Sequence, residues 1–300
     1  MVTQLLVIRA AESCDRPIDG LPWIHLYWPD GLMKRVRWPV HANFLGRIRT
    51  FQIKKSHPAI DGSLPARLPA FANSLQEFIY DPPLTIYGKL MCKLASEYLL
   101  QTKGNFGSCL GGVAYCSPCL CCIQTLDVLL TNLGDHETKI RIEPGLADFV
   151  DHHGFERAPT FYTTEQFGLL KITRVDKSYH PIFQISAWKS SESRAAFCDR
   201  QKKVVDSLFD VHKGDVLLLV TQGPNLAAIS HAMRKMPIEL DITVPMLKKV
   251  PKLACCTMEK DGAIFKLVKP LLPPLKCPKS GYLQWDEWDD TIQHVEEEEY

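Results

Sequence analysis

The sequence lacks several features that would place it in a special class of protein. It has no apolar run of about eighteen residues, so we expect no membrane-spanning helix. It has almost no net charge, because 35 lysines and arginines balance 34 acidic residues. This balance provides no overall attraction for nucleic acid or an anionic membrane, and we expect neither as a partner. Residues 1–9 contain no basic segment before their short apolar run, so we expect no signal peptide.

The rest of the composition is typical of a globular protein. Of the 300 residues, 46% are hydrophobic and 23% are charged, which excludes intrinsic disorder, collagen-like repeats and low-complexity character. The eleven cysteines are an odd number in a long chain that lacks a secretory signal. This favours reduced thiols over a disulfide framework. We therefore expect a globular cytoplasmic protein.

Short apolar runs alternate along the chain with longer segments of helical periodicity. Residues 5–8 (LLVI) have polar neighbours, as expected of a strand buried on both faces, and residues 216–220 (VLLLV) give the strongest strand pattern. Ser117 and Pro118 are a favourable N-cap and first-turn pair for the helix that follows them. The predicted strands are 5–8, 111–116, 139–142, 216–220, 253–258 and 263–268, and the predicted helices are 85–101, 120–133, 192–209 and 226–233.

This alternation predicts an α/β fold, a three-layer α/β/α sandwich around a mainly parallel sheet. The segments 20–80 and 150–190 are rich in proline and aromatic residues, and we expect them to be insertions over the C-terminal ends of the strands. Residues 259–262 (EKDG) are predicted to form the loop of a hairpin. We expect a single domain over residues 1–290 and a solvated acidic tail over residues 291–300.

Small or polar residues follow three of the predicted strands. They are residues 9–12 (RAAE), 115–118 (YCSP) and 221–224 (TQGP). The carboxyl ends of parallel strands meet at one edge of a sheet, so the three segments are predicted to line a common pocket.

Four motifs make the chain resemble the histidine phosphatase (phosphoglycerate mutase-like) superfamily. They are residues 81–88 (DPPLTIYG), 115–125 (beginning YCSP and ending CIQT), 139–146 (KIRIEPGL) and 217–223 (LLLVTQG). They follow the family's order and spacing, and the likeness runs from about residue 3 to Trp285. Within the superfamily the chain most resembles the phosphatase domain of the ubiquitin-associated and SH3 domain-containing suppressors of T-cell receptor signalling. The resemblance implies the phosphoglycerate mutase-like fold, and we expect the ubiquitin-binding and SH3 modules to be absent.

The resemblance also implies a mechanism for an intact member of the family. A histidine at the end of the first strand attacks phosphorus, while arginines and a second histidine hold the transferring oxygens. A carboxylic acid then protonates the leaving oxygen. In this chain Ala10 stands at the position of the nucleophile, and Ser13 stands at the position of a phosphate-binding arginine.

Two further positions of this pocket depart from the family. Cys121 replaces another arginine, and Gln222 replaces the second histidine. Arg9 is intact, and Asp148 stands where the family has its acid, which makes Asp148 the candidate acid. Arg9 is predicted either to bind a phosphate or carboxylate, because its guanidinium matches such anions bidentately, or to pair with Glu12 or Asp148.

These departures predict a pseudophosphatase, a catalytically impaired protein with a histidine phosphatase fold that acts as a binding or regulatory module. Loss of a covalent nucleophile costs several orders of magnitude in rate. Loss of each group that stabilises charge in the transition state costs roughly 10²–10³. Gln222 donates and accepts hydrogen bonds but carries no positive charge, so it either contacts a ligand or only preserves the shape of the pocket.

Other functions remain open. The alternative is an active or residual phosphohydrolase that acts on phosphorylated protein or small molecules through water or an unrecognised nucleophile. A third hypothesis is a regulatory partner of an active relative. We expect a protein partner or a homodimer, a phosphate-like anion as ligand, and no cofactor.

The cysteine-rich segment 116–122 (CSPCLCC) suggests a zinc hypothesis, because Cys-x-x-Cys spacing supplies half of a tetrahedral site. His152 and His153 are candidates for the other half. We expect buried apolar cysteines and no metal, with a redox-active thiol as the alternative. Cys121 lacks the Cys-x5-Arg spacing of cysteine phosphatases, so we do not expect it to be a replacement nucleophile.

Overall fold

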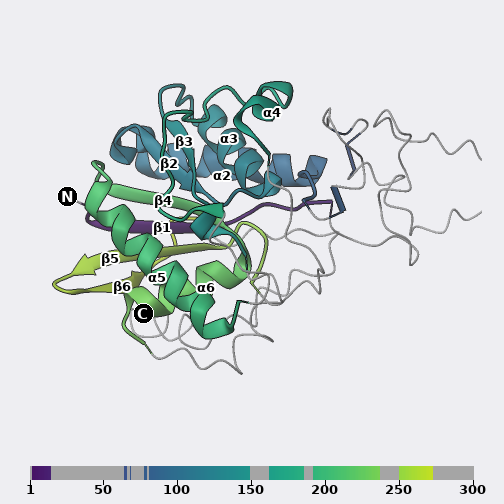
Figure 1. Cartoon of the computed structure of the whole chain (residues 1–300). Helices are drawn as coiled ribbons and strands as arrows, with labels where there is room; N and C mark the ends of the chain where they lie inside the picture. Colours follow the sequence, from purple (N-terminus) through teal and green to yellow (C-terminus); the bar gives the residue numbers. More distant parts are fainter. Residues whose placement is uncertain are drawn as a thin grey trace, which may run out of the picture.

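A computed structural model describes residues 2–14, 64–65, 68, 78–79, 81–148, 162–185, 192–236 and 250–272. In this part of the chain, six strands form one sheet in the order β3-β2-β4-β1-β5-β6 (Figure 1). The strands are β1 (Gln4–Arg9), β2 (Val113–Cys116), β3 (Lys139–Ile142), β4 (Val216–Thr221), β5 (Cys255–Asp261) and β6 (Ile264–Val268). The helices are α2 (Ile86–Lys103), α3 (Leu120–Asn132), α4 (Thr164–Leu169), α5 (Arg194–Val211) and α6 (Gly223–Met233), with short 3-10 turns η3 (Phe106–Leu110) and η4 (Pro144–Leu146).

The four strands β3, β2, β4 and β1 are parallel, and β5 and β6 are antiparallel. The register aligns Arg9 with Thr221 and Cys116 with Val220, so β1, β2 and β4 end at the same edge of the sheet. The predicted mainly parallel sheet is confirmed. Its parallel part brings the three predicted pocket segments together at one edge.

Helices cover both faces of the sheet, as Figure 1 shows. Because successive side chains of a strand point to opposite faces, β1 contributes to two separate clusters of the core. Leu6 and Ile8 belong to the cluster that includes buried residues of α2 and α3. Leu5 and Val7 belong to the cluster that includes buried residues of α5 and α6. This arrangement confirms the three-layer α/β/α fold.

The predicted helices and strands are all present, but several of their ends differ from the prediction. The predicted N-cap Ser117 is wrong, because α3 begins at Leu120 with Cys119 as its N-cap. The Ser117 backbone N–H donates instead to the Val220 carbonyl of β4 (2.9 Å). The predicted hairpin loop 259–262 is also too long, because β5 continues to Asp261 and pairs with Ile264.

Parts of several predictions lie outside the described residues. These are most of the predicted insertion 20–80, part of 150–190 with His152 and His153, and the acidic tail 291–300. The described part of the second insertion contains α4, which the sequence did not predict. No helix among the described residues is both long and apolar enough to cross a membrane.

Candidate functional site

The end of β1 forms the floor of the predicted pocket. Ala10 is completely buried, and its backbone N–H donates to the Thr221 carbonyl of β4 (2.8 Å). The next residue, Ala11, is also buried, and its N–H donates to Oγ1 of Thr125 in α3 (3.0 Å). The backbone of this segment is therefore fixed from both neighbouring elements. The Ala10 side chain is a methyl group, which has neither a lone pair nor a transferable proton.

Residues 81–88 form backbone hydrogen bonds with the segment that follows β1. The Thr85 N–H donates to the Glu12 carbonyl (3.0 Å), and the Cys14 N–H donates to the Pro83 carbonyl (2.9 Å). At Gly88, in the first turn of α2, an added Cβ would lie 2.2 Å from the Glu12 carbonyl oxygen. Only glycine allows this close approach, so the last residue of the motif is required by packing against the backbone after β1.

Asp81 joins this motif to the start of α3. Its Oδ1 accepts a hydrogen bond from the Leu120 N–H (2.7 Å), which would otherwise lack a partner in the first turn of the helix. The residue is buried, and burial raises the pKa of its carboxyl well above the ordinary value, with a further rise from the nearby Cys121. The sequence prediction did not include Asp81 among the site residues, although its place before Pro82 and Pro83 indicated a turn.

Cys121 and Gln222 contact each other at this edge. The Gln222 side chain donates from Nε2 to the Cys121 sulfur at 3.1 Å. Cys121 lies in the first turn of α3 and is 2% exposed, whereas Gln222 is the partly buried N-cap of α6. The structure thus brings together two of the four predicted pocket positions. The amide of one is hydrogen-bonded to the sulfur of the other.

Arg9 and Ser13 lie before and after Ala10 in the chain. Arg9 is the last residue of β1 and is partly buried, and its backbone N–H donates to the Ala254 carbonyl (2.8 Å). Ser13 is 4% exposed, and its Oγ accepts a hydrogen bond from Nζ of Lys252 at 3.2 Å. The sequence prediction did not include Lys252, because no local pattern relates it to a residue 239 positions earlier.

The loop before Asp148 is held by a single buried carboxylate. Glu143 accepts hydrogen bonds from the Gly145 N–H (2.9 Å) and from the Tyr179 hydroxyl (2.7 Å). It also accepts from the N–H groups of Ile182 (2.8 Å) and Phe183 (3.0 Å). Glu143 is completely buried, so these four donors satisfy its charge in place of water.

Side chains from α5 and α6 donate hydrogen bonds to the carbonyls of the same loop. Arg200 of α5 donates from Nη1 to the carbonyls of Gly145 (2.6 Å) and Ala147 (3.0 Å). Asn225 of α6 donates from Nδ2 to the carbonyls of Leu146 and Ala147, each at 3.0 Å. Asp148 directly follows this fixed loop and is partly buried. The candidate acid is therefore attached to a rigid support.

A family model of the histidine phosphatase superfamily (branch 1) matches residues 72–263. The chain belongs to this superfamily. It is 27% identical to the mouse ubiquitin-associated and SH3 domain-containing protein B over 243 residues, which cover 79% of this chain and 37% of the mouse protein. It is 26% identical to the ecdysteroid-phosphate phosphatase of Drosophila melanogaster over 230 residues, which cover 75% of this chain and 30% of the fly protein. This chain therefore spans about a third of the length of these relatives.

A solved structure has the same fold. The crystal structure of the ecdysone phosphate phosphatase from Bombyx mori in complex with tungstate superimposes with a TM-score of 0.69 and 22% sequence identity. The match covers 95% of this chain and 98% of that chain. The predicted family and fold are confirmed.

The hydrogen bonds that hold the backbone at this edge are present, whereas the side chains expected of an active family member are not found at the predicted catalytic positions. The segments 81–88 and 143–147 are held by the hydrogen bonds described above. The position predicted to correspond to the family nucleophile is Ala10, whose side chain is a methyl group, and the position predicted for the second histidine is Gln222, whose side chain is a neutral amide. Neither group forms a bond to phosphorus or carries a positive charge.

The cysteine-rich segment forms part of the core. Every cysteine in the described residues is a free thiol. Cys116 and Cys122 are completely buried, and burial raises the pKa of both thiols. Within the described ranges, no three histidine, cysteine or acidic side chains are arranged as metal ligands, and His152 and His153 lie outside these ranges. Protonated, buried thiols of this kind are poor nucleophiles.

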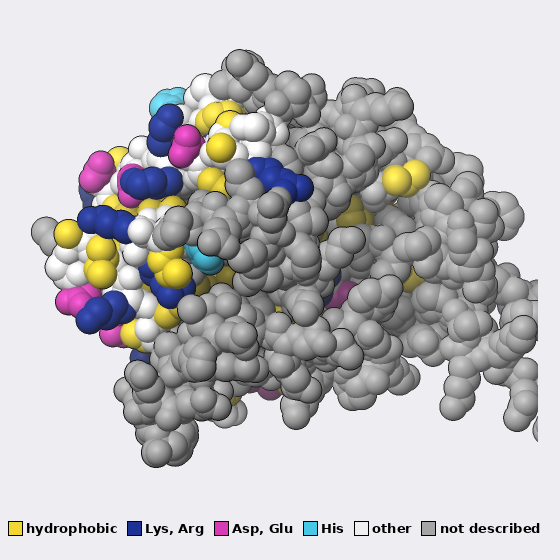
Figure 2. Space-filling model, turned by 90° about the horizontal axis from the view of Figure 1, so that it is seen from below, with side chains coloured by type: hydrophobic (Ala, Val, Ile, Leu, Met, Phe, Trp, Pro, Cys, Tyr) yellow, Lys and Arg dark blue, Asp and Glu magenta, His cyan; other side chains and the backbone are white. Residues whose placement is uncertain are grey.

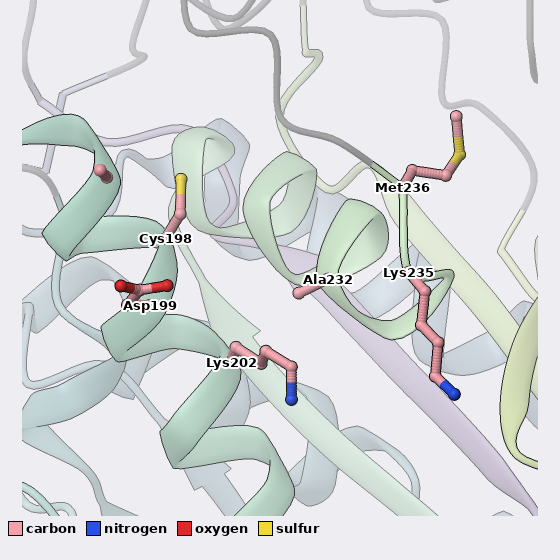
Figure 3. Close-up of a pocket in the computed structure, with 7 residues that line it drawn as sticks. Cys198, Asp199, Lys202, Ala232, Lys235 and Met236 are labelled. Carbon is pink, nitrogen blue, oxygen red and sulfur yellow. The ribbon is translucent and has the colours of Figure 1, made fainter.

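A hollow lies between α5 and the end of α6 (Figure 3). It has a volume of about 400 Å³ and includes Cys198 and Lys202 of α5 and Lys235 just after α6. Gln222 caps the other end of α6, so the residues of this hollow at the end of α6 lie one helix length away from Gln222. On the face shown in Figure 2, basic and acidic side chains are interspersed among the described residues.

Proposed function

We propose that this chain is a pseudophosphatase, a histidine phosphatase fold that acts as a binding or regulatory module rather than as a catalyst. The observation that carries this proposal is the completely buried methyl group of Ala10 at the end of β1. The family mechanism needs an imidazole there to form a bond to phosphorus. The Ala10 side chain instead belongs to the hydrophobic core cluster that includes Leu6 and Ile8.

The other half of the pocket supports the same proposal. A second cationic group would stabilise the negative charge of the transition state. Here Gln222 is uncharged, and its amide is bonded to the Cys121 sulfur. The buried Cys121 is also a poor candidate for a replacement nucleophile, because its side chain is 2% exposed.

Arg9 supports a remaining role in binding an anion. Its guanidinium stays charged at every physiological pH and matches the oxygens of a phosphate or carboxylate. The silkworm phosphatase with the same fold is described in complex with tungstate, a tetrahedral oxyanion. We infer that this chain binds a phosphate-like anion through Arg9, and that its partners include a protein or a second copy of itself.

The test is turnover of an aryl phosphate by the purified protein, measured against an Arg9→Ala variant and a buffer blank. We expect no turnover above the blank for either protein. Turnover by the unmodified chain that disappears in Arg9→Ala would overturn the proposal in favour of a phosphohydrolase. A phosphorylated form of the chain, trapped by rapid quench during such turnover, would overturn it as well.

A further inference from the structure

The segment before β5 is attached to the end of β1, and this attachment brings a lysine to the altered pocket. The Arg9 N–H donates to the Ala254 carbonyl (2.8 Å), and the Leu253 N–H donates to the Ala10 carbonyl (3.4 Å). Residues 253 and 254 therefore lie beside residues 9 and 10. Lys252 precedes this contact and reaches Ser13, three positions beyond Ala10.

The backbone of this segment has an uncommon conformation. Leu253 has a φ of +60°, in the left-handed region that costs a residue with a side chain about 1–2 kcal/mol. The other described non-glycine residues with positive φ, Lys171 and Lys235, directly follow the last turns of α4 and α6, where such a residue is common. Leu253 lies in a turn, and the described residues 250–252 before it are not helical. Its side chain is 3% exposed, so packing in the core holds the strained conformation in place.

The contact at Ser13 changes the interpretation of that position. The family has a phosphate-binding arginine where this chain has Ser13, and the loss of that arginine removes one positive charge. Nζ of Lys252 lies 3.2 Å from the Ser13 hydroxyl, and Lys252 is partly buried. An ammonium group from a distant segment therefore occupies the neighbourhood from which the charge was lost.

We propose that Lys252 supplies the second cation of an oxyanion-binding site whose first cation is Arg9. This inference rests on the proposed function, since it assumes that the pocket binds an anion without turning it over. An ammonium group is a compact charge with three donors, whereas a guanidinium holds two oxygens in a fixed plane. The site is suited to a tetrahedral oxyanion such as a phosphate monoester, and it lacks the bidentate grip of a second arginine.

The experiment measures the binding of inorganic phosphate and of tungstate by isothermal titration calorimetry at low salt. The variants are Arg9→Ala, Lys252→Gln and Lys252→Arg. Lys260→Gln is the matched control, because Lys260 is an exposed lysine of β5. We expect Lys252→Gln and Arg9→Ala each to weaken binding at least tenfold, and Lys252→Arg and Lys260→Gln to stay within threefold of the unmodified protein. Thermal unfolding of each variant shows that its fold is intact.

The outcomes separate this inference from the proposed function. If Arg9→Ala abolishes binding while Lys252→Gln binds like Lys260→Gln, Lys252 is not part of the site and the inference is wrong, but anion binding through Arg9 stands. If the unmodified protein binds neither oxyanion, anion binding and the inference both fail. If Lys252→Gln does not fold, full binding by Lys252→Arg supports the inference, and binding lost in the folded Lys252→Arg overturns it.

Discussion

The loop of residues 143–147 and the altered pocket positions lie at the same edge of the sheet but differ in how they are bonded. The loop is held by a buried carboxylate with four donors and by Arg200 and Asn225. In contrast, the predicted pocket positions Gln222 and Cys121 meet through a hydrogen bond from an amide to a sulfur, which is a weak acceptor. The groups that hold the backbone are therefore separate from the side chains at the predicted reactive positions. We therefore expect substitutions of side chains at the predicted pocket positions to leave the fold intact.

The two kinds of group differ in whether their hydrogen-bond partners belong to the protein or to the substrate. Glu143 is completely buried, and a buried charge without its donors is strongly unfavourable. A catalytic histidine or arginine, however, has its main partner in the substrate. Replacing such a residue by alanine or glutamine leaves no buried group of the protein unsatisfied.

The largest expected effect comes from Glu143→Gln. Oε1 of Glu143 accepts from Gly145 and Phe183, and Oε2 accepts from Tyr179 and Ile182. An amide replaces one of these oxygens by a donor, so two buried donors lose their acceptor. At about 1–3 kcal/mol for each, we expect the free energy of unfolding to fall by about 2–6 kcal/mol, measured by urea denaturation.

The control for this variant is Glu137→Gln, because Glu137 is exposed. We expect it to change the free energy of unfolding by less than about 0.5 kcal/mol. Equal stability of Glu143→Gln and Glu137→Gln would show that the carboxylate does not hold the loop.

A smaller loss is expected from Gly88→Ala, which tests the other backbone support. Its Cβ would lie 2.2 Å from the Glu12 carbonyl oxygen, so α2 has to move away from the segment after β1. Overpacking of this kind costs about 1–3 kcal/mol, and we expect the melting temperature to fall accordingly. Gly168→Ala in α4 is the matched control, because no atom lies within 4 Å of its added Cβ. A loss in Gly168→Ala as large as that in Gly88→Ala would refute the close-approach argument.

The smallest effect is expected at the pocket itself. Gln222→Ala removes the bond to the Cys121 sulfur, which involves a weak acceptor at a partly buried position. We expect the free energy of unfolding to change by less than about 1 kcal/mol. A double-mutant cycle with Cys121→Ala measures the coupling of the two side chains. If Gln222→Ala lowered the free energy of unfolding as much as Glu143→Gln does, the pocket positions would contribute to stability as strongly as the loop, against our expectation.

The sequence predicted the fold because its strands have clear local signatures. The apolar runs at β1 and β4 are buried on both faces, and such runs identify central parallel strands without knowledge of their partners. The same runs predicted that the segments after β1 and β4 meet, and these two strands do end beside each other. Whether the chain is impaired in catalysis stays a prediction.

The contacts that complete the site were beyond local patterns. The start of α3 was misplaced because Ser117 has the right chemistry for an N-cap, whereas the Leu120 N–H is satisfied by Asp81 from another segment. Lys252 reaches Ser13 across 239 positions, and neither periodicity nor motif spacing encodes such a pairing. Both the start of α3 and the partner of Ser13 depend on segments that are distant in the sequence and meet only in the folded chain.

The cap of α3 has a consequence for the order of folding. Asp81 and Leu120 are 39 positions apart, so the hydrogen bond that completes the first turn forms only after a long loop has closed. Helix formation within residues 120–132 alone leaves that turn frayed, and docking of the segment around Asp81 finishes it. We therefore expect the first turn of α3, which contains Cys121, to become ordered only when the segment around Asp81 has docked.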